Sequence, residues 1–203
     1  IKKINSKKIN FSNFNFKKIP NILGVLNLTP DSFSDGGKFN SFKRATQRIK
    51  KMIDSGADII DIGGESTRPG SKIISQKNEL LRVKKIIEKF KKKFPKTLLS
   101  VDTRKSSVID YSLKKKADII NDISCFNFDD NSFNSVKNKN IWKIIHHMQG
   151  TPQTMQMNPR YNHVLLDIYD FFEEQIQNFN QDNFKKKLIL DPGIGFGKKL
   201  KHN

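Results

Sequence analysis

Cysteine and tryptophan are scarce in this 203-residue sequence, which contains one of each. Because Cys125 is the single cysteine, a disulfide within the chain is excluded, and the composition fits a reducing compartment. No Cys/His spacing typical of a zinc site accompanies it. We therefore expect a cytoplasmic protein in which Cys125 has no catalytic context.

Long hydrophobic runs are also absent from the sequence. No apolar stretch approaches the roughly 20 residues of a membrane-spanning helix. Residues Ile1–Lys18 are basic but lack the apolar centre of a signal peptide. We therefore expect no membrane association. The sequence does not begin with methionine, so we expect it to be a fragment of a longer chain.

Acidic residues are few: 20 Asp and Glu stand against 38 Lys and Arg, which gives a net charge of +18. Nucleic-acid binding is one interpretation of this excess. However, no basic–aromatic motif of a nucleic-acid module is present, and most lysines fall in helix-like stretches such as Lys84–Lys93, where they are typical of solvated faces. Asn, Ile, Phe and Lys are abundant throughout, as biased codon usage would produce. We expect no nucleic-acid partner, and an anionic small substrate fits the charge equally well.

Short apolar segments alternate with amphipathic ones along the chain. This rhythm predicts strands at Asn21–Leu26, Asp58–Ile62, Thr97–Val101, Asp118–Ile120, Ile141–Ile145 and Lys187–Leu190. It predicts helices at Ser41–Ser55, Ser75–Phe94, Ser106–Lys116, Asp130–Asn138 and Asn162–Asn180. Strands that alternate with helices and are apolar on both faces indicate a parallel sheet covered on both sides.

Two α/β architectures fit such a pattern, an open doubly wound sheet and a closed (β/α)8 TIM barrel. No G-x-G-x-x-G follows the first strand, which weighs against a dinucleotide-binding sheet. Two further units would bring the chain near the roughly 250 residues of a barrel. We therefore predict a TIM barrel with about six of its eight units present, made of an N-terminal extension (1–20) and a barrel domain (21–203) that is incomplete at its C-terminus.

Polar residues follow the carboxyl end of every predicted strand. They are Asn27, then Asp61, Glu65, Thr67 and Arg68, then Asp102 and Arg104, then Asn121 and Asp122, then His146 and His147, and finally Asp191. In a parallel barrel these positions converge on one face, where active sites lie. Two loops there, Thr29–Gly37 and Gly63–Ser71, are rich in Ser and Gly and are candidate lids.

Six motifs together resemble dihydropteroate synthase, a pterin-binding family. They are GVLNLTPDSFSDGG (Gly24–Gly37), DIGGESTRPG (Asp61–Gly70), SVDT (Ser100–Thr103), Asn121-Asp122-Ile123, HMQG (His147–Gly150) and DPGIGFGK (Asp191–Lys198). Their order and spacing match the family from about Asn21 to Asn203. The resemblance implies a (β/α)8 barrel that condenses (7,8-dihydropterin-6-yl)methyl diphosphate with 4-aminobenzoate to give 7,8-dihydropteroate and diphosphate.

The resemblance also implies roles for individual residues. Asp102, Asn121 and Asp191 match the pterin-binding positions, where paired hydrogen bonds meet the amidine-like edge of the pterin. Met148 is expected to line the floor near the pterin. Asn27 resembles the ligand of a Mg²⁺ ion at the diphosphate, because amide oxygens suit hard cations.

Other residues are implied at the reacting end of the substrates. Thr67 and Arg68 match a loop that closes on them, with Arg68 meeting the diphosphate in a charge-assisted fork. Pro69 and Phe196 resemble walls of the 4-aminobenzoate pocket. Asp35 is expected to approach the metal or the developing positive carbon when the loops close.

The family also places Ser-Arg-Lys after a seventh strand and Arg-x-His after an eighth, and neither segment is present here. We therefore expect the 203-residue chain by itself to be poorly folded and inactive, and the full-length parent to be an active homodimer. Two alternatives remain open. One is a pterin-dependent methyltransferase on the same barrel, and the other is a truncated, non-catalytic relic.

Overall fold

The computed structural model describes residues 20–29, 38–68, 70–179 and 182–203. Its six strands form one parallel sheet in the order β1-β2-β3-β4-β5-β6. They are β1 (Leu23–Asn27), β2 (Ile59–Gly63), β3 (Leu98–Asp102), β4 (Ile119–Asp122), β5 (Trp142–His146) and β6 (Leu188–Asp191). All six predicted strands are therefore present, each displaced by one or two residues toward the C-terminus. In five of them a polar residue at the end joins the sheet, and in β2 it is Gly63.

Helices follow the strands and agree with the predicted order. They are α2 (Lys38–Asp54), α3 (Gln76–Lys93), α4 (Ser106–Lys114), α5 (Ser132–Val136) and α6 (Val164–Asn178), with a short α7 (Asp182–Lys185) and a 3-10 turn, η1 (Leu200–His202), that the hydrophobic pattern did not predict. Helix α4 ends before the predicted Lys116, because that residue has a left-handed φ of 64°.

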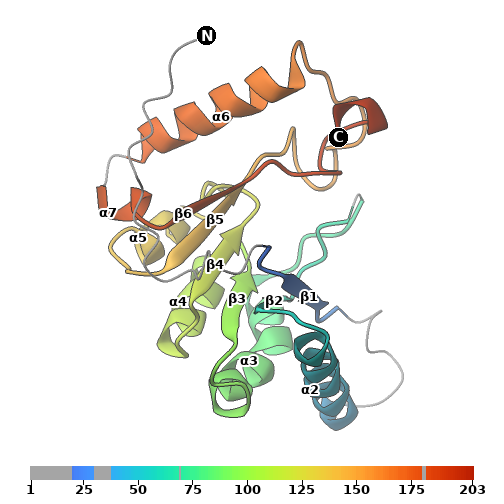
Figure 1. The fold of residues 1–203 in the computed structure, drawn as a ribbon, viewed down its shortest axis with the longest axis vertical. Helices are drawn as coiled ribbons and strands as arrows, with labels where there is room; N and C mark the ends of the chain where they lie inside the picture. The colour runs from blue at the N-terminus through green and yellow to red at the C-terminus, as the bar shows by residue number, and fades with distance from the viewer. Residues whose placement is uncertain (1–19, 30–37, 69, 180–181) are drawn as a thin grey trace.

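The strand order distinguishes between the two predicted architectures. Each strand lies beside its neighbour in sequence, whereas a doubly wound sheet reverses direction at a switch point. Helices α2, α3 and α4 lie along one side of the sheet (Figure 1). Consecutive βα units in a single direction are the wall of a TIM barrel, which confirms the predicted fold class with six of its units.

The two faces of the sheet differ in their packing. The larger core lies between sheet and helices and includes Leu26, Ile60, Ile87 and Phe90. The other face, which is the barrel interior, holds a small apolar cluster of Ile59, Ile119, Trp142 and Ile144, packed by Leu23, Leu98 and Ile189. Further along the same inward rows the residues become polar. The interior is thus apolar at the amino ends of the strands and polar at their carboxyl ends.

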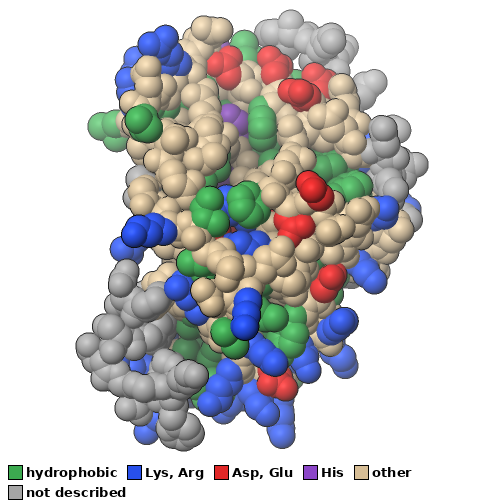
Figure 2. Space-filling model, turned by 180° about the vertical axis from the view of Figure 1, so that it is seen from behind, with side chains coloured by type: hydrophobic (Ala, Val, Ile, Leu, Met, Phe, Trp, Pro, Cys, Tyr) green, Lys and Arg blue, Asp and Glu red, His purple; other side chains and the backbone are tan. Residues whose placement is uncertain are grey.

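Helix α6 packs less closely than the others and buries one residue, Phe172. Its end meets a group of aromatic rings in which Phe179 and Phe184 lie 4.3 Å apart between ring centroids. Lys and Arg side chains gather mainly over the end of the molecule formed by α2, α3 and α4, whereas Asp and Glu are more frequent toward α6 (Figure 2). Among the described helices, none is long and apolar enough to cross a membrane.

Candidate functional site

A row of polar residues crosses the carboxyl ends of the first four strands. The register places Asn27 beside Gly63, Gly63 beside Asp102, and Asp102 beside Asn121. A Cβ atom on Gly63 would lie 3.0 Å from Asn27 Oδ1 and 3.3 Å from Asp102 Oδ2. Glycine at this position therefore lets the amide and the carboxylate approach the same space.

Asp61 lies one layer below this row and supports it. Asn121 Nδ2 donates a hydrogen bond to Asp61 Oδ2 over 3.0 Å, which fixes the orientation of the Asn121 amide. Within the described part of the chain, the Asn121 Oδ1 atom and the Asp61 Oδ1 atom are buried without hydrogen-bond partners. Unpaired buried acceptors are costly, and a ligand with N–H donors would satisfy them. The sequence placed Asp61 at a strand end but gave it no role in the site.

The electrostatics of this cluster favour ligands that donate hydrogen bonds. Burial raises the pKa of Asp102 well above its usual value, and the neighbouring carboxyls of Asp61 and Glu79 raise it further. Burial likewise raises the pKa of Asp61, although the hydrogen bond from Asn121 opposes the shift. The Asp102 carboxyl makes no hydrogen bond within the described part of the chain. Such a carboxyl gains most from a ligand that supplies donors or positive charge.

Asp191 faces this row from β6 and has one oxygen free of backbone contacts. Its Oδ1 accepts a hydrogen bond from Gly193 N over 2.8 Å. Its Oδ2 lies 3.9 Å from His146 Nε2. The His146 ring in turn packs edge-on against Phe196, with 4.5 Å between ring centroids. The residues implied at the pterin and at the 4-aminobenzoate pocket, Asp191 and Phe196, are therefore linked through His146.

Lys198 fixes the loop that carries Phe196. Its Nζ atom contacts Gly193 O at 2.9 Å, Phe196 O at 3.2 Å and His147 Nδ1 at 2.9 Å. Burial lowers the pKa of His147 to about 4, and burial lowers that of Lys198 to about 8. Neutral His147 accepts this bond from the ammonium group. The sequence motif contained Lys198, but only the structure shows that it ties the loop together.

The base of the Gly63–Ser71 loop is anchored by a buried ion network. Glu65 Oε2 accepts from Arg104 Nε over 2.9 Å, and Glu65 Oε1 accepts from Lys105 Nζ over 2.8 Å. Lys105 Nζ also contacts Glu79 Oε2 at 2.5 Å. Burial acts to raise the pKa of Glu65, but Lys105, the Ile74 amide and Arg104 hold it below its usual value. The network positions the segment that carries Thr67 and Arg68.

A segment after β5 connects this loop with the Asp191–Lys198 loop. Gln153 Nε2 donates to Ser71 O over 2.9 Å. Gln156 Nε2 donates to Gly195 O over 2.5 Å, and Tyr161 Oη donates to Gly197 O over 2.8 Å. Hydrogen bonds from one segment thus position two loops that arise far apart in the sequence. Periodicity gave no signal for these contacts, because they depend on the path of a loop.

Arg68 and Asn27 share a cavity of about 630 Å³ at the edge of the sheet. Three cations of α2 also line it, Arg44, Arg48 and Lys51, which sequence reasoning missed. Their spacing of four and three residues places them on one helix face, a signal that could have been read. The cavity therefore combines an amide oxygen with four positive side chains and suits a polyanion.

A Mg²⁺ ion fits the chemistry of Asn27 rather than a protein cage. Among the described residues, no group of three or more His, Cys, Asp or Glu side chains could hold a metal. Mg²⁺ bound to phosphates commonly uses one or two protein oxygens and several waters. The Asn27 Oδ1 atom, beside Gly63 and the cationic cavity, would supply such an oxygen.

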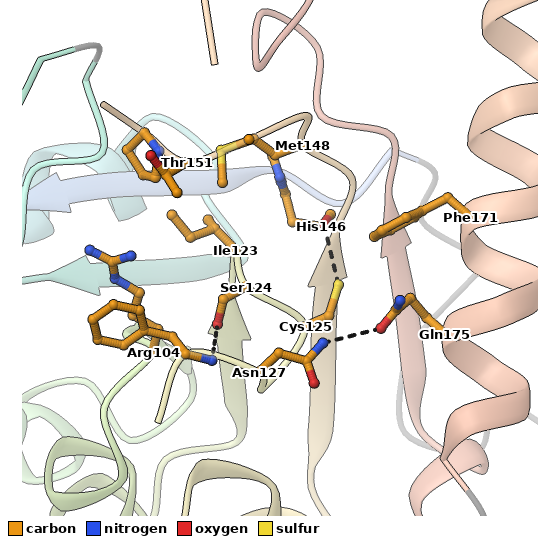
Figure 3. A pocket seen from close by; sticks show the side chains of 13 residues that line it. Arg104, Ile123, Ser124, Cys125, Asn127, His146, Met148, Thr151, Phe171 and Gln175 are labelled. Atoms are coloured by element: carbon orange, nitrogen blue, oxygen red, sulfur yellow. Dashed lines mark hydrogen bonds between the residues drawn. The ribbon is translucent and has the colours of Figure 1, made fainter. Parts of the chain in front are cut away.

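The remaining predicted residues fall into two groups. Thr67 lies in the described part of the loop and is partly buried, and Met148 lines the cavity between β4, β5 and α6 (Figure 3). Pro69 and Asp35 lie outside the described residues. Cys125 is buried in the wall of the same cavity, and burial raises the pKa of its thiol to about 12. Burial therefore disfavours the thiolate form of Cys125.

These features define a TIM-barrel protein whose candidate site, at the carboxyl ends of the strands, is built from carboxylates and amides that suit a ligand rich in N–H donors. The chain matches the family described as pterin binding enzyme over residues 23–203, and it belongs to that family.

Proteins named dihydropteroate synthase are among its relatives. The chain is 45% identical over 185 residues to the dihydropteroate synthase of Escherichia coli (strain K12), covering 91% of this chain and 65% of that protein. The structure of Yersinia pestis dihydropteroate synthase with a sulfonamide drug complex superposes with a TM-score of 0.81 at 42% identity, covering 91% and 66% of the two chains. For Xanthomonas albilineans dihydropteroate synthase with 4-aminobenzoic acid, the TM-score is 0.79 at 34% identity, covering 91% and 65%. The chain thus spans about 65% of the length of these relatives.

Proposed function

We propose that this protein acts as a dihydropteroate synthase. It would condense (7,8-dihydropterin-6-yl)methyl diphosphate with 4-aminobenzoate to give 7,8-dihydropteroate and diphosphate in folate biosynthesis. The observation that carries the proposal is the convergence of Asp102, Asn121 and Asp191 at the carboxyl ends of three strands. The identity of 45% to a relative with this name supports the same reaction.

The pterin ring would be held by the buried carboxylates and amides. Its amidine-like edge presents N–H donors to Asp102 and Asp191, and Asn121 can donate to or accept from the adjacent ring atoms. Asp61 orients Asn121 through the 3.0 Å hydrogen bond. Because these acceptors are buried, a ring without the matching donors would leave them unpaired and bind weakly.

The diphosphate would lie toward the cationic cavity. Arg68 is the residue placed to meet it, and Asn27 would hold Mg²⁺, which neutralises charge on the leaving group when bound. Arg44, Arg48 and Lys51 add positive potential on the same side. A site of this composition stabilises the charge that develops as the carbon–oxygen bond breaks.

The chemical step is a displacement at the methylene carbon. The lone pair of the aryl amine forms the new carbon–nitrogen bond, and the electrons of the breaking carbon–oxygen bond leave with diphosphate. The amine then loses its extra proton to solvent, so no strong base is required. Phe196, Thr67 and Pro69 would wall the 4-aminobenzoate pocket, and Asp35 stays a predicted partner of the metal or the reacting carbon.

The proposal extends to assembly and location. We expect a homodimer, as implied by the resemblance, and a cytoplasmic location in keeping with a single, free cysteine. No nucleic-acid or membrane partner is expected. Analytical ultracentrifugation and a salt series of DNA binding would test the first and third of these expectations.

Condensation activity tests the central proposal. The full-length gene product is incubated with the dihydropterin diphosphate, 4-aminobenzoate and Mg²⁺, and diphosphate release is followed over time. Release should require both the amine and Mg²⁺. We expect Asp102→Ala and Asp191→Ala each to reduce kcat/KM by about 100-fold or more, because each removes a charge-assisted contact to the pterin.

The matched control is Asp110→Ala, which changes an exposed carboxylate on α4 and should leave the rate within about twofold. A folded protein that binds pterin but releases no diphosphate would contradict the proposal. Binding of methyltetrahydrofolate by that protein would then indicate the pterin-dependent methyltransferase, and its absence the non-catalytic relic.

A further inference from the structure

We propose that Lys198 is a positioning residue for the second substrate: it holds Phe196 in the wall of the proposed 4-aminobenzoate pocket and so sets the affinity for the aryl amine. The inference rests on the proposed function and deepens it, because it names a side chain on which one wall of that pocket depends. Lys198 is 4% exposed, and its ammonium group is directed at three groups of the protein. It therefore acts through the loop that it holds.

The loop around Phe196 has little stiffness of its own. Its glycines Gly193, Gly195 and Gly197 all have left-handed backbone angles, with φ of 70°, 79° and 59°. Glycine loses more conformational freedom on folding than any other residue. Phe196 N donates to Gly193 O over 2.9 Å and closes one turn of this loop. A loop of such composition keeps Phe196 in one place only when further contacts hold it.

Lys198 supplies those contacts from a buried position. Its Nζ atom donates to Gly193 O over 2.9 Å and to Phe196 O over 3.2 Å, which are the carbonyls at the two ends of the turn. The third contact, to His147 Nδ1 at 2.9 Å, reaches the segment that follows β5. An ammonium group has three N–H donors, so each contact uses one of them. The turn that carries Phe196 is thus tied to the end of β5.

The tie fixes both the backbone and the ring of this turn. Gly193 lies so close to His147 O that a Cβ atom on it would collide with that oxygen. The Phe196 ring packs edge-on against His146, with 4.5 Å between ring centroids. His146 Nε2 in turn lies 3.9 Å from Asp191 Oδ2. A turn released from the end of β5 would therefore move the Phe196 wall relative to Asp191, the residue proposed to hold the pterin.

The protonation states of the two partners support a permanent bond near neutral pH. Burial, and then the charge of Lys198, lower the pKa of His147 to about 4, so the imidazole is neutral and can accept. Burial lowers the pKa of Lys198 to about 8, which leaves the ammonium form predominant at pH 7. The same three bonds are then present before and during the reaction. The wall that they position would contact the aryl ring equally in the ground state and in the transition state.

Lys198→Met in the full-length gene product tests the inference, because the thioether fills similar space and donates no hydrogen bond. We expect the KM for 4-aminobenzoate to rise at least about fivefold, because the substrate must now order the wall itself. The kcat and the KM for the dihydropterin diphosphate should stay within about threefold, because the lost binding is shared by ground state and transition state. Lys201→Met, at an exposed position, is the matched control and should change each constant less than about twofold.

A merely structural lysine would give a different pattern: a smaller active fraction lowers the apparent kcat and leaves KM unchanged. An unchanged KM for 4-aminobenzoate in a folded Lys198→Met variant would therefore overturn the inference. Lys198→Arg retains the charge and several donors, so its KM should rise less than that of Lys198→Met. It is the test variant, under the same criterion, if circular dichroism shows that Lys198→Met does not fold.

A double variant shows whether Lys198 acts through Phe196. Phe196→Ala by itself should raise the KM for 4-aminobenzoate, because it removes the wall. Adding Lys198→Met to Phe196→Ala should then raise this KM by less than about twofold further, since no ring is left to position. Effects that multiply fully in the double variant would show that Lys198 acts by another route, and the inference would be wrong.

Hydrogen exchange separates this inference from the proposed function, because it requires no turnover. The backbone amides of residues 193–198 should exchange at least about tenfold faster in Lys198→Met than in the parent or in Lys201→Met. Equal exchange in all three would refute the positioning role, even in an active enzyme. Faster exchange in a parent chain that releases no diphosphate would instead refute the proposed function, and with it the effect on the aryl amine, while the tie between Lys198 and the Phe196 turn would stand.

Discussion

At the scale of single residues, the Asp102 carboxyl is suited to a ligand that donates hydrogen bonds, but its burial destabilises the folded state. Burial and neighbouring carboxyls raise its pKa well above the usual value, so its ionised form is disfavoured in the native state. When the pKa of an acid is higher in the folded state than in the unfolded state, the folded state binds more protons than the unfolded state. The free energy of unfolding then falls as the pH rises from the unfolded-state pKa through the folded-state pKa. The residue therefore opposes folding most at neutral and alkaline pH.

Asp102→Asn tests this trade-off. We expect the variant to be more stable than the parent by about 1–2 kcal/mol at pH 8, with a smaller difference at pH 4, because the amide cannot ionise. Its pterin affinity should fall at least tenfold. Urea denaturation at the two pH values measures the first effect, and Asp110→Asn, at an exposed site, should show neither. A variant that is less stable at both pH values would contradict the electrostatic account.

Lys143 offers a parallel case away from the site. It lies on β5 and is fully buried, and its Nζ atom has no hydrogen-bond partner among the described residues. The atom lies 5.0 Å from the centroid of the Phe184 ring. Burial, and then the charge of Lys187, lower its pKa to about 8. The unfolded chain therefore binds an extra proton between pH about 8 and 10.5, and stability rises with pH across that window.

Lys143→Met should raise the free energy of unfolding at pH 7 by about 1–3 kcal/mol, because a thioether of similar length fills the space without a buried charge. The gain over the parent should shrink as pH rises above about 8. Lys139→Met, at an exposed position, is the matched control. Thermal unfolding monitored between pH 7 and 10 measures both, and an unchanged or lower stability at pH 7 would argue against a strained lysine.

At the scale of elements, the ion network beneath the Gly63–Ser71 loop decides how well that loop is positioned. Lys105→Met leaves two buried carboxylates, Glu65 and Glu79, without their shared partner. We expect a loss of about 3–5 kcal/mol. Adding Glu79→Gln should recover part of that loss, since one uncompensated charge is removed. Chemical denaturation of single and double variants measures the coupling, and strictly additive effects would show that the network is not a unit.

Periodicity predicted the elements well and their contacts poorly. Each strand was detectable because its residues are apolar on both faces, and each long helix because its apolar stripe recurs every three to four residues. The strands end later than predicted because Asn27, Asp102 and Asp191 pair with residues of neighbouring strands. A hydrophobic pattern cannot predict that a polar residue belongs to a strand. Short α7 and the hydrogen bonds of Gln153 and Gln156 depend on tertiary packing and leave no local pattern.

The site was predicted unevenly for the same reason. Asp102, Asn121 and Asp191 were placed on the site face because a parallel barrel brings strand ends together, and their pterin role was implied by the resemblance to the family. Lys198 was not assigned, since its bonds to carbonyls of its own loop become visible only when the loop is folded. Arg104 was placed at a strand end, but the cavity it lines required the positions of α6 and Phe128.

At the scale of the whole molecule, the sheet order explains how a chain with an excess of lysine can carry a site dominated by carboxylates. On the face shown in Figure 2 the cations lie mainly over the end formed by α2, α3 and α4, and acidic side chains are more frequent toward α6. Asp61, Asp102 and Asp191 lie on the strands of the sheet. Under the proposed function, an overall charge of +18 would attract anionic substrates from solution, and the local carboxylates would then select for donor groups. Attraction and selection are thus assigned to different parts of the molecule.

The position of Trp142 makes it an intrinsic fluorescence probe of the protein. It is the single tryptophan of the sequence and lies 5% exposed in the barrel interior, beside Ile59, Ile119 and Ile144 and below the polar strand ends. A native protein should therefore emit at short wavelength and shift to the red on unfolding. A pterin bound above it absorbs in the near ultraviolet and would quench this emission by energy transfer, so site occupancy can be followed in real time without an attached dye.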